Sequence, residues 1–194
     1  MKRFFAENSY TMVKLFIFQL AISIMGFVTA TATLKLGVWS LLSSVFCTVV
    51  YLCLIWTVGY MEGQKDGIRI EAGRLKPFPA KFFIISLISN SINIVAGLLA
   101  FIFRACSNAP LTYVVENAEY SPEWAVNGHE IANLIARLLQ AMYLGIINYV
   151  GKSNVILLLI IPLPAIIVTG FSYIAGVKYK DGFIKQNKPS SGKM

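Results

Sequence analysis

Four long apolar runs, each free of charged residues, dominate the pattern of the chain. They cover residues 15–32, 38–60, 82–103 and 155–176. Each run is close to the roughly 20 apolar residues that an α-helix needs to cross a bilayer. The pattern therefore predicts an all-α integral membrane protein with four transmembrane helices, which form a single transmembrane helical domain over residues 1–185.

The distribution of Lys and Arg predicts which helix ends face the cytoplasm. The polar break over residues 59–81 carries more Lys and Arg than Asp and Glu, as is typical of a cytoplasmic loop. The stretches before residue 15 and after residue 176 are basic as well. We therefore expect both termini to be cytoplasmic. The last residues, 186–194, are polar and contain Pro, Ser and Gly, so we expect a disordered tail.

Residues 131–150 are ambiguous between a span and part of an amphipathic helix that covers about 121–150. Their polar residues recur at steps of three and four and draw a stripe along one helix face, namely Glu130, Asn133, Arg137 and Gln140. Inside hydrocarbon, Arg137 would cost about 2.5–3.5 kcal/mol on insertion scales. A fifth span would also place the basic tail outside. We therefore expect an amphipathic helix on the outer surface or dipping partway in, with five transmembrane helices as the alternative.

Two local signals modify the picture of four continuous spans. Ala30-Thr31-Ala32 ends the first apolar run and fits the small-residue site of a signal peptide, so cleavage there stays an open alternative to an uncleaved span. Pro162 and Pro164 remove backbone donors inside the last run and predict a kink or break. We interpret that break as a packing feature.

Polar residues inside the runs predict either close helix packing or a polar pathway. The pathway candidates are Gln19, Asn90 and Asn93, of which the two Asn residues are the stronger because an amide costs more in lipid than a hydroxyl. Close packing of small and weakly polar faces is the competing interpretation. The four runs contain no Asp, Glu, Lys, Arg or His, so proton-coupled transport would lack its usual carboxylate.

The stretch around His129 is one residue short of a zinc-hydrolase motif. Asn133 stands where H-E-x-x-H needs its second His, and the chain has a single His, so a zinc site of that class is excluded. We expect no metal and no cofactor. His129, Glu130 and Arg137 form a candidate outer site for a membrane-bound enzyme that acts on lipid or peptide. No catalytic site is evident, and a phosphate-binding loop is absent from the sequence.

The basic loop carries the one resemblance to a known group of proteins. It contains Lys65-Asp66-Gly67 and Gly73-Arg74 and is followed by Lys81 and Asn90. In these residues the chain resembles small uncharacterised multi-pass membrane proteins of Gram-positive bacteria. The resemblance implies the bacterial plasma membrane and no activity, and it points to a candidate cytoplasmic-loop site at Lys65, Asp66, Gly73 and Arg74. A structured loop with salt bridges and headgroup contacts is the alternative.

Composition supports the membrane class and limits the partners. The chain of 194 residues is 57% hydrophobic and 13% charged, with a mean hydropathy of +0.68. Its net charge of +8 sits mostly beside apolar runs, which indicates anionic headgroups rather than nucleic acid. We expect a membrane subunit or a channel- or permease-like component, with a homo-oligomer or a partner membrane subunit possible in view of the thin core. A structural or immunity-type protein is a further alternative.

Overall fold

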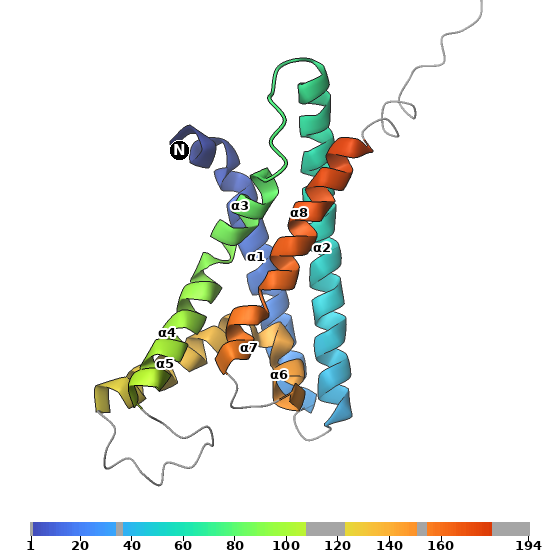
Figure 1. Cartoon of the computed structure of the whole chain (residues 1–194). Helices are drawn as coiled ribbons and strands as arrows, with labels where there is room; N and C mark the ends of the chain where they lie inside the picture. Colours follow the sequence, from blue (N-terminus) through green and yellow to red (C-terminus); the bar gives the residue numbers. More distant parts are fainter. Residues whose placement is uncertain (1, 34–36, 108–122, 151–154, 180–194) are drawn as a thin grey trace, which may run out of the picture.

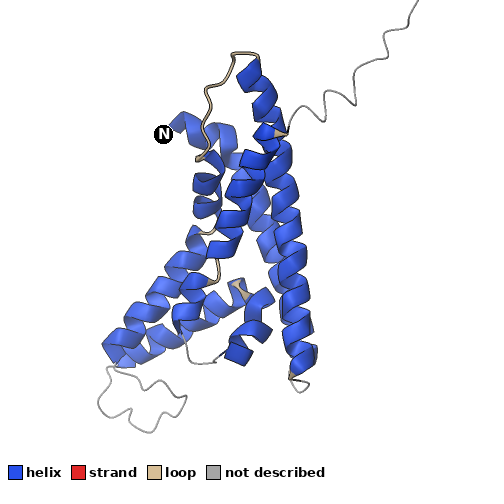
Figure 2. Ribbon diagram, turned by 45° about the vertical axis from the view of Figure 1, so that its right-hand side comes forward, coloured by secondary structure: helices blue, strands red, loops and turns tan. Residues whose placement is uncertain are grey.

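The computed structural model describes residues 2–33, 37–107, 123–150 and 155–179, and every regular element in these ranges is a helix (Figure 2). The elements are α1 (Lys2–Thr33), α2 (Val38–Glu71), α3 (Lys81–Ser89), α4 (Ser91–Ser107), α5 (Glu123–Leu139), η3 (Ala141–Tyr143), α6 (Leu144–Val150), α7 (Val155–Ile160) and α8 (Leu163–Lys178). The all-helical prediction is confirmed. The predicted tail, residues 186–194, and the first residues of the predicted outer helix lie outside the described ranges.

Three of the described helices are long and apolar enough to cross a membrane. They are Phe4–Thr33, Val38–Glu71 and Ile156–Lys178, and two bent helix pairs bring the number up to five if each pair is one span. The apolar runs therefore correspond to membrane-span-like helices. The number of spans within this range stays a prediction.

Helix α2 extends well beyond the apolar run that predicted it. The sequence suggested a polar loop over residues 59–81, whereas α2 continues to Glu71 and leaves a short connection to α3. The extension packs against α8 through glycines: a Cβ at Gly63 would overlap the Tyr173 carbonyl oxygen, and one at Gly176 would overlap that of Tyr60. Small residues let two helix backbones approach this closely, which is why the polar extension of α2 stays helical beside α8.

The third apolar run is bent rather than straight. Helices α3 and α4 meet at Asn90 with an angle of 55°. The Asn90 side-chain Nδ2 donates to the Ser86 carbonyl oxygen at 2.9 Å, so this side chain competes for a helix carbonyl that the backbone also uses. The bend at Asn90 divides the expected span over residues 82–103 into two helices, and whether the pair forms one span stays a prediction.

Residues 123–150 form two helices joined by a sharp bend, which we call the hairpin, and not one continuous helix. Helices α5 and α6 are joined by the turn at Gln140 and η3 with an angle of 82°. The start of α5 and the end of α6 lie toward the same end of the molecule, and the turn between them lies inside the bundle (Figures 1 and 2). Gln140, Ala141 and Met142 are almost fully buried. The middle of this segment is therefore interior, which a surface helix would not be.

Contacts with the first two helices hold the tip of the hairpin. Ser23 on α1 donates its hydroxyl to the Leu139 carbonyl oxygen at 2.7 Å, and the Gly145 N–H donates to the Ser44 Oγ on α2 at 2.7 Å. Ser23 lies about 15 Å along the axis from the Thr33 end of α1 at a rise of about 1.5 Å per residue. The tip therefore lies well inside the bundle and not at the Thr33 end of α1.

The last run is interrupted at its prolines, although its two parts together still form one candidate span, Ile156–Lys178. Helix α7 ends at Ile160, and α8 begins at Leu163 directly after Pro162. Since Pro lacks the N–H that would continue the ladder, the break follows from the residue type. This prediction is confirmed.

Candidate functional site

Five buried polar side chains gather where the bent α3–α4 pair meets the hairpin tip and α2. We call them the central polar cluster, and they are Tyr51, Asn90, Asn93, Gln140 and Tyr143. Asn93 Nδ2 donates to Asn90 Oδ1 at 3.3 Å. The Tyr51 side chain interacts with Asn90 and lies near Tyr143. The cluster therefore joins α2, α4 and the hairpin tip.

Gln140 connects the cluster to the broken last run. Its Nε2 donates to the Leu158 carbonyl oxygen at 3.0 Å. The same carbonyl oxygen would lie 3.4 Å from a Cβ at Gly97, which follows Asn93 by about one turn on the same face of α4. Gln140 therefore lies beside Gly97 and α7, about one turn along α4 from Asn93.

Several polar atoms in this region have no hydrogen-bond partner among the described residues. They are Asn93 Oδ1, Gln140 Oε1, the Tyr143 hydroxyl and Gln19 Oε1. Leaving such a group unsatisfied costs about 1–3 kcal/mol, and most buried polar groups in proteins are paired. Buried polar atoms of this kind are usually completed by an ordered water or a ligand.

The structure brings together two of the three predicted pathway residues. Asn90 and Asn93 are in contact, while Gln19 lies on α1, one turn before Ser23, whose hydroxyl bonds to the end of α5. Gln19 therefore lies on the face of α1 that packs against the hairpin. The sequence pattern does not single out Tyr143. The spacing of apolar and polar residues around it is that of a helix and does not reveal the bend at η3.

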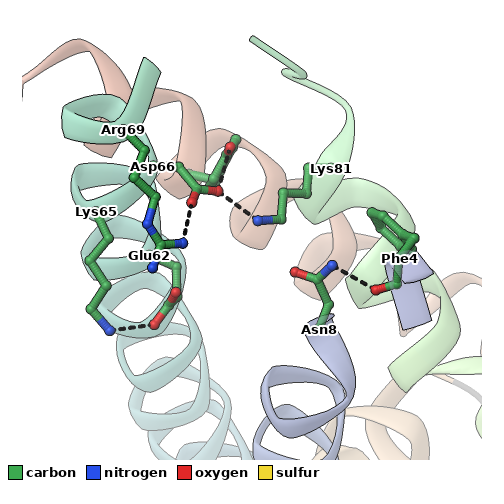
Figure 3. Close-up of polar contacts among 8 residues, drawn as sticks. Phe4, Asn8, Glu62, Lys65, Asp66, Arg69 and Lys81 are labelled. Atoms are coloured by element: carbon green, nitrogen blue, oxygen red, sulfur yellow. Dashed lines mark hydrogen bonds and ion pairs between the residues drawn. The ribbon is translucent and has the colours of Figure 1, made fainter. Parts of the chain in front are cut away.

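A second polar site lies at the α2–α3 end, around the carboxylate of Asp66. Asp66 Oδ2 lies 2.6 Å from Lys81 Nζ and accepts a hydrogen bond from the Tyr173 hydroxyl at 3.0 Å, and Asp66 Oδ1 lies 3.5 Å from Arg69 (Figure 3). Asp66 is 1% exposed, whereas Lys81 is 17% and Arg69 is 63% exposed. The Tyr173 ring stacks on Phe82 at 4.7 Å between centroids. The carboxylate therefore ties together α2, α3 and α8.

The other three residues that the sequence predicts for a cytoplasmic-loop site have separate roles. Lys65 pairs with Glu62 at 2.6 Å on the exposed side of α2 (Figure 3). Gly73 has φ +69° and ends α2 in a Schellman motif, in which the Arg74 N–H donates to the Arg69 carbonyl oxygen at 2.9 Å. Of the four predicted residues, Asp66 alone is buried.

The candidate outer site does not converge. His129 Nδ1 bonds to the Ala100 carbonyl oxygen at 2.9 Å, which ties α5 to α4, and Arg137 Nε donates to Asn133 Oδ1 at 3.0 Å about two turns further along. Glu130 is exposed. Within the described ranges, no group of three or more His, Cys, Asp or Glu side chains is placed to hold a metal ion. The geometry of this region is that of helix packing.

Together, these features define a helical protein with three to five candidate membrane spans, which indicates a membrane location. No family model, curated protein or solved structure matches the chain. The buried polar sites are therefore the available guide to function.

Proposed function

We propose that this protein is a channel- or permease-like component of the bacterial plasma membrane, and that its central polar cluster lines the pathway. The observation that carries the proposal is the set of unpartnered, buried polar atoms at Asn93, Gln140 and Tyr143. Two helix breaks, at Asn90 and Gln140, meet there. Irregular backbone at membrane depth is tolerated where it is buried in protein or lines a polar path, and broken helices form such sites in many transporters.

The proposal includes four spans with both termini in the cytoplasm. The start of α1 and the ends of α2 and α8 lie toward one end of the molecule (Figure 1). Basic residues near this end are Lys65, Arg69, Arg74, Lys76, Lys81 and Lys178. Lys and Arg favour the cytoplasmic side, and a hairpin that returns to the side it entered keeps the number of spans even.

Cysteine accessibility tests this topology. In a background without Cys47, Cys53 and Cys106, the variants Tyr149→Cys and Tyr179→Cys place probes at two exposed sites. We expect an impermeant thiol reagent to label residue 149 from outside and residue 179 from inside. The reverse pattern would mean that α5 and α6 together cross the membrane, and would refute the four-span arrangement.

A second labelling experiment tests the pathway itself. In membrane vesicles, Asn93→Cys should react with a small water-soluble thiol reagent from at least one side. Leu98→Cys is the matched control, because Leu98 lies on the same helix and is exposed on its outer face, which we expect to meet lipid. Ser86→Cys gives a second buried position should the first variant fold poorly. Absence of labelling at both buried positions in folded protein would contradict the pathway.

We also propose that the basic end contacts anionic headgroups and that the chain works with other membrane chains, as a homo-oligomer or with a partner subunit. Four spans offer a thin core, and large apolar side chains are exposed along α2, among them Trp39 and Phe46. The mass of the purified protein in mild detergent tests the association. A monomer without any co-purifying chain would refute it.

A further inference from the structure

We propose that the central polar cluster binds a small uncharged ligand that donates hydrogen bonds, such as a primary amide. This inference rests on the proposed function and names the class of ligand for the same site. It follows from which atoms of the cluster are left open, and from where the buried charge of the protein lies.

The hydrogen bonds determine which way the Asn side chains point. Asn90 Nδ2 donates to the Ser86 carbonyl oxygen, so Asn90 presents its Oδ1 to Asn93. An oxygen there requires a donor, so Asn93 must place its Nδ2 against it. The atom of Asn93 that remains open is consequently Oδ1, an acceptor, on a side chain with no exposed surface.

The same argument applies to Gln140. Its bond to the Leu158 carbonyl oxygen requires Nε2, so its open atom is Oε1. Tyr143 contributes a hydroxyl that can donate or accept. Two amide oxygens and one hydroxyl are therefore left open. They suit a ligand with hydrogen-bond donors and disfavour an anion, which offers acceptors alone.

The location of the buried charge favours a neutral ligand. Asp66 is the one fully buried charged side chain in the described part of the chain. It lies about 22 Å along α2 from Tyr51 at a rise of about 1.5 Å per residue, and it is already paired with Lys81. A cation at the central polar cluster would lack a counter-charge in a low-dielectric interior, and burying an unpaired charge is strongly unfavourable.

A series of amides that differ in donor number tests the inference on the full chain in detergent. The probes are acetamide with two N–H donors, N-methylacetamide with one, and N,N-dimethylacetamide with none. Methylammonium is the charged probe. We expect the melting temperature to rise most with acetamide, by about 3 °C at about ten times Kd, less with the second amide, and not with the last two.

Tyr143→Phe is the sharpest variant, because it removes a hydroxyl that has no hydrogen-bond partner among the described residues. We expect it to fold normally and to lose at least half of the acetamide shift. Asn93→Leu should lose the shift as well, and Leu98→Met, on the exposed face of the same helix, should retain it. Solvent effects of the amides act on all variants alike, so the comparison with wild type removes them.

Two outcomes would overturn the inference: equal shifts for the three amides in wild type and Tyr143→Phe, or a larger shift with methylammonium. The outcomes also distinguish a failure of the proposed pathway from a failure of the proposed ligand class. Donor-dependent binding without labelling of Asn93→Cys would mean a closed binding site rather than a pathway. Labelling without donor-dependent binding would keep the pathway and refute the ligand class.

Discussion

The carboxylate of Asp66 lies 2.6 Å from the ammonium of Lys81, which connects the last turns of α2 to the first residue of α3. The Tyr173 hydroxyl binds the same carboxylate oxygen at 3.0 Å from α8. A buried carboxylate is stable when it is paired and hydrogen-bonded, and here both conditions are met by residues distant in sequence. This contact holds the polar extension of α2 against the bundle.

Loss of the lysine should therefore destabilise the protein strongly. We expect Lys81→Met to lower the free energy of unfolding by about 3–5 kcal/mol, because it leaves a buried carboxylate without its closest cation. Denaturation in mixed detergent micelles measures the change. Lys65→Met is the matched control: its pair with Glu62 is exposed, so we expect a change of at most about 1 kcal/mol. Similar effects in the two variants would contradict the role assigned to Asp66.

The two partners should be energetically coupled. In a double-mutant cycle with Asp66→Asn and Lys81→Met, we expect a coupling energy of about 1–3 kcal/mol, since the double variant no longer contains an unpaired buried charge. The same unfolding measurement on four proteins gives the value. Simple additivity would show that the two side chains do not act as a pair.

The close approach of α2 and α8 should be sensitive to a single methyl group. Gly63→Ala would place Cβ against the Tyr173 carbonyl oxygen, so we expect a destabilisation of about 1–3 kcal/mol. Helix propensity acts in the opposite direction, because Ala is favoured over Gly by about 1 kcal/mol in a helix. Ala21→Val adds volume on the exposed side of α1 and serves as the control, with a change within about 0.5 kcal/mol. A stabilised Gly63→Ala variant would show that the helices separate easily.

Two tyrosines give a matched comparison of bound and unbound hydroxyls. Tyr173→Phe removes a hydroxyl that donates to the buried Asp66 carboxylate, so we expect a loss of about 1.5–3 kcal/mol. Tyr143→Phe removes a hydroxyl that has no partner in the described part of the chain, so we expect the stability of the ligand-free protein to be unchanged or higher. Thermal unfolding of both variants measures the difference. A large loss in Tyr143→Phe would point to a structural bond and away from a binding role.

Some elements of the site could be predicted from sequence because their cause is local. The break at Pro162 follows from a missing N–H, and Asn90 and Asn93 stood out because amides are costly in lipid. The bend at Asn90 and the turn at Gln140 could not be predicted in the same way. The bend at Asn90 depends on which carbonyl oxygen its side chain binds, here that of Ser86. The turn at Gln140 depends on a partner in another helix, the Leu158 carbonyl oxygen.

The burial of Asp66 could not be predicted from the sequence. The apolar run predicts that the second span ends near Tyr60, which puts Asp66 in a polar loop. Its burial depends on Lys81 and Tyr173 and on the glycine contacts that bring α8 close. A charge can be buried only when its partners are in place, and their positions are a property of the tertiary structure.

The helical class and the membrane character of the protein follow from the amino-acid sequence alone, because a bilayer requires each spanning segment to be apolar and to satisfy its own backbone hydrogen bonds. Three features are properties of the tertiary structure: the sharp bend in residues 123–150, the position of Gln140 and Tyr143 beside the bent α3–α4 pair and α2, and the burial of Asp66. These outcomes depend on contacts between segments far apart in the chain, such as that of Ser23 with Leu139, and such contacts leave no periodic pattern in either segment.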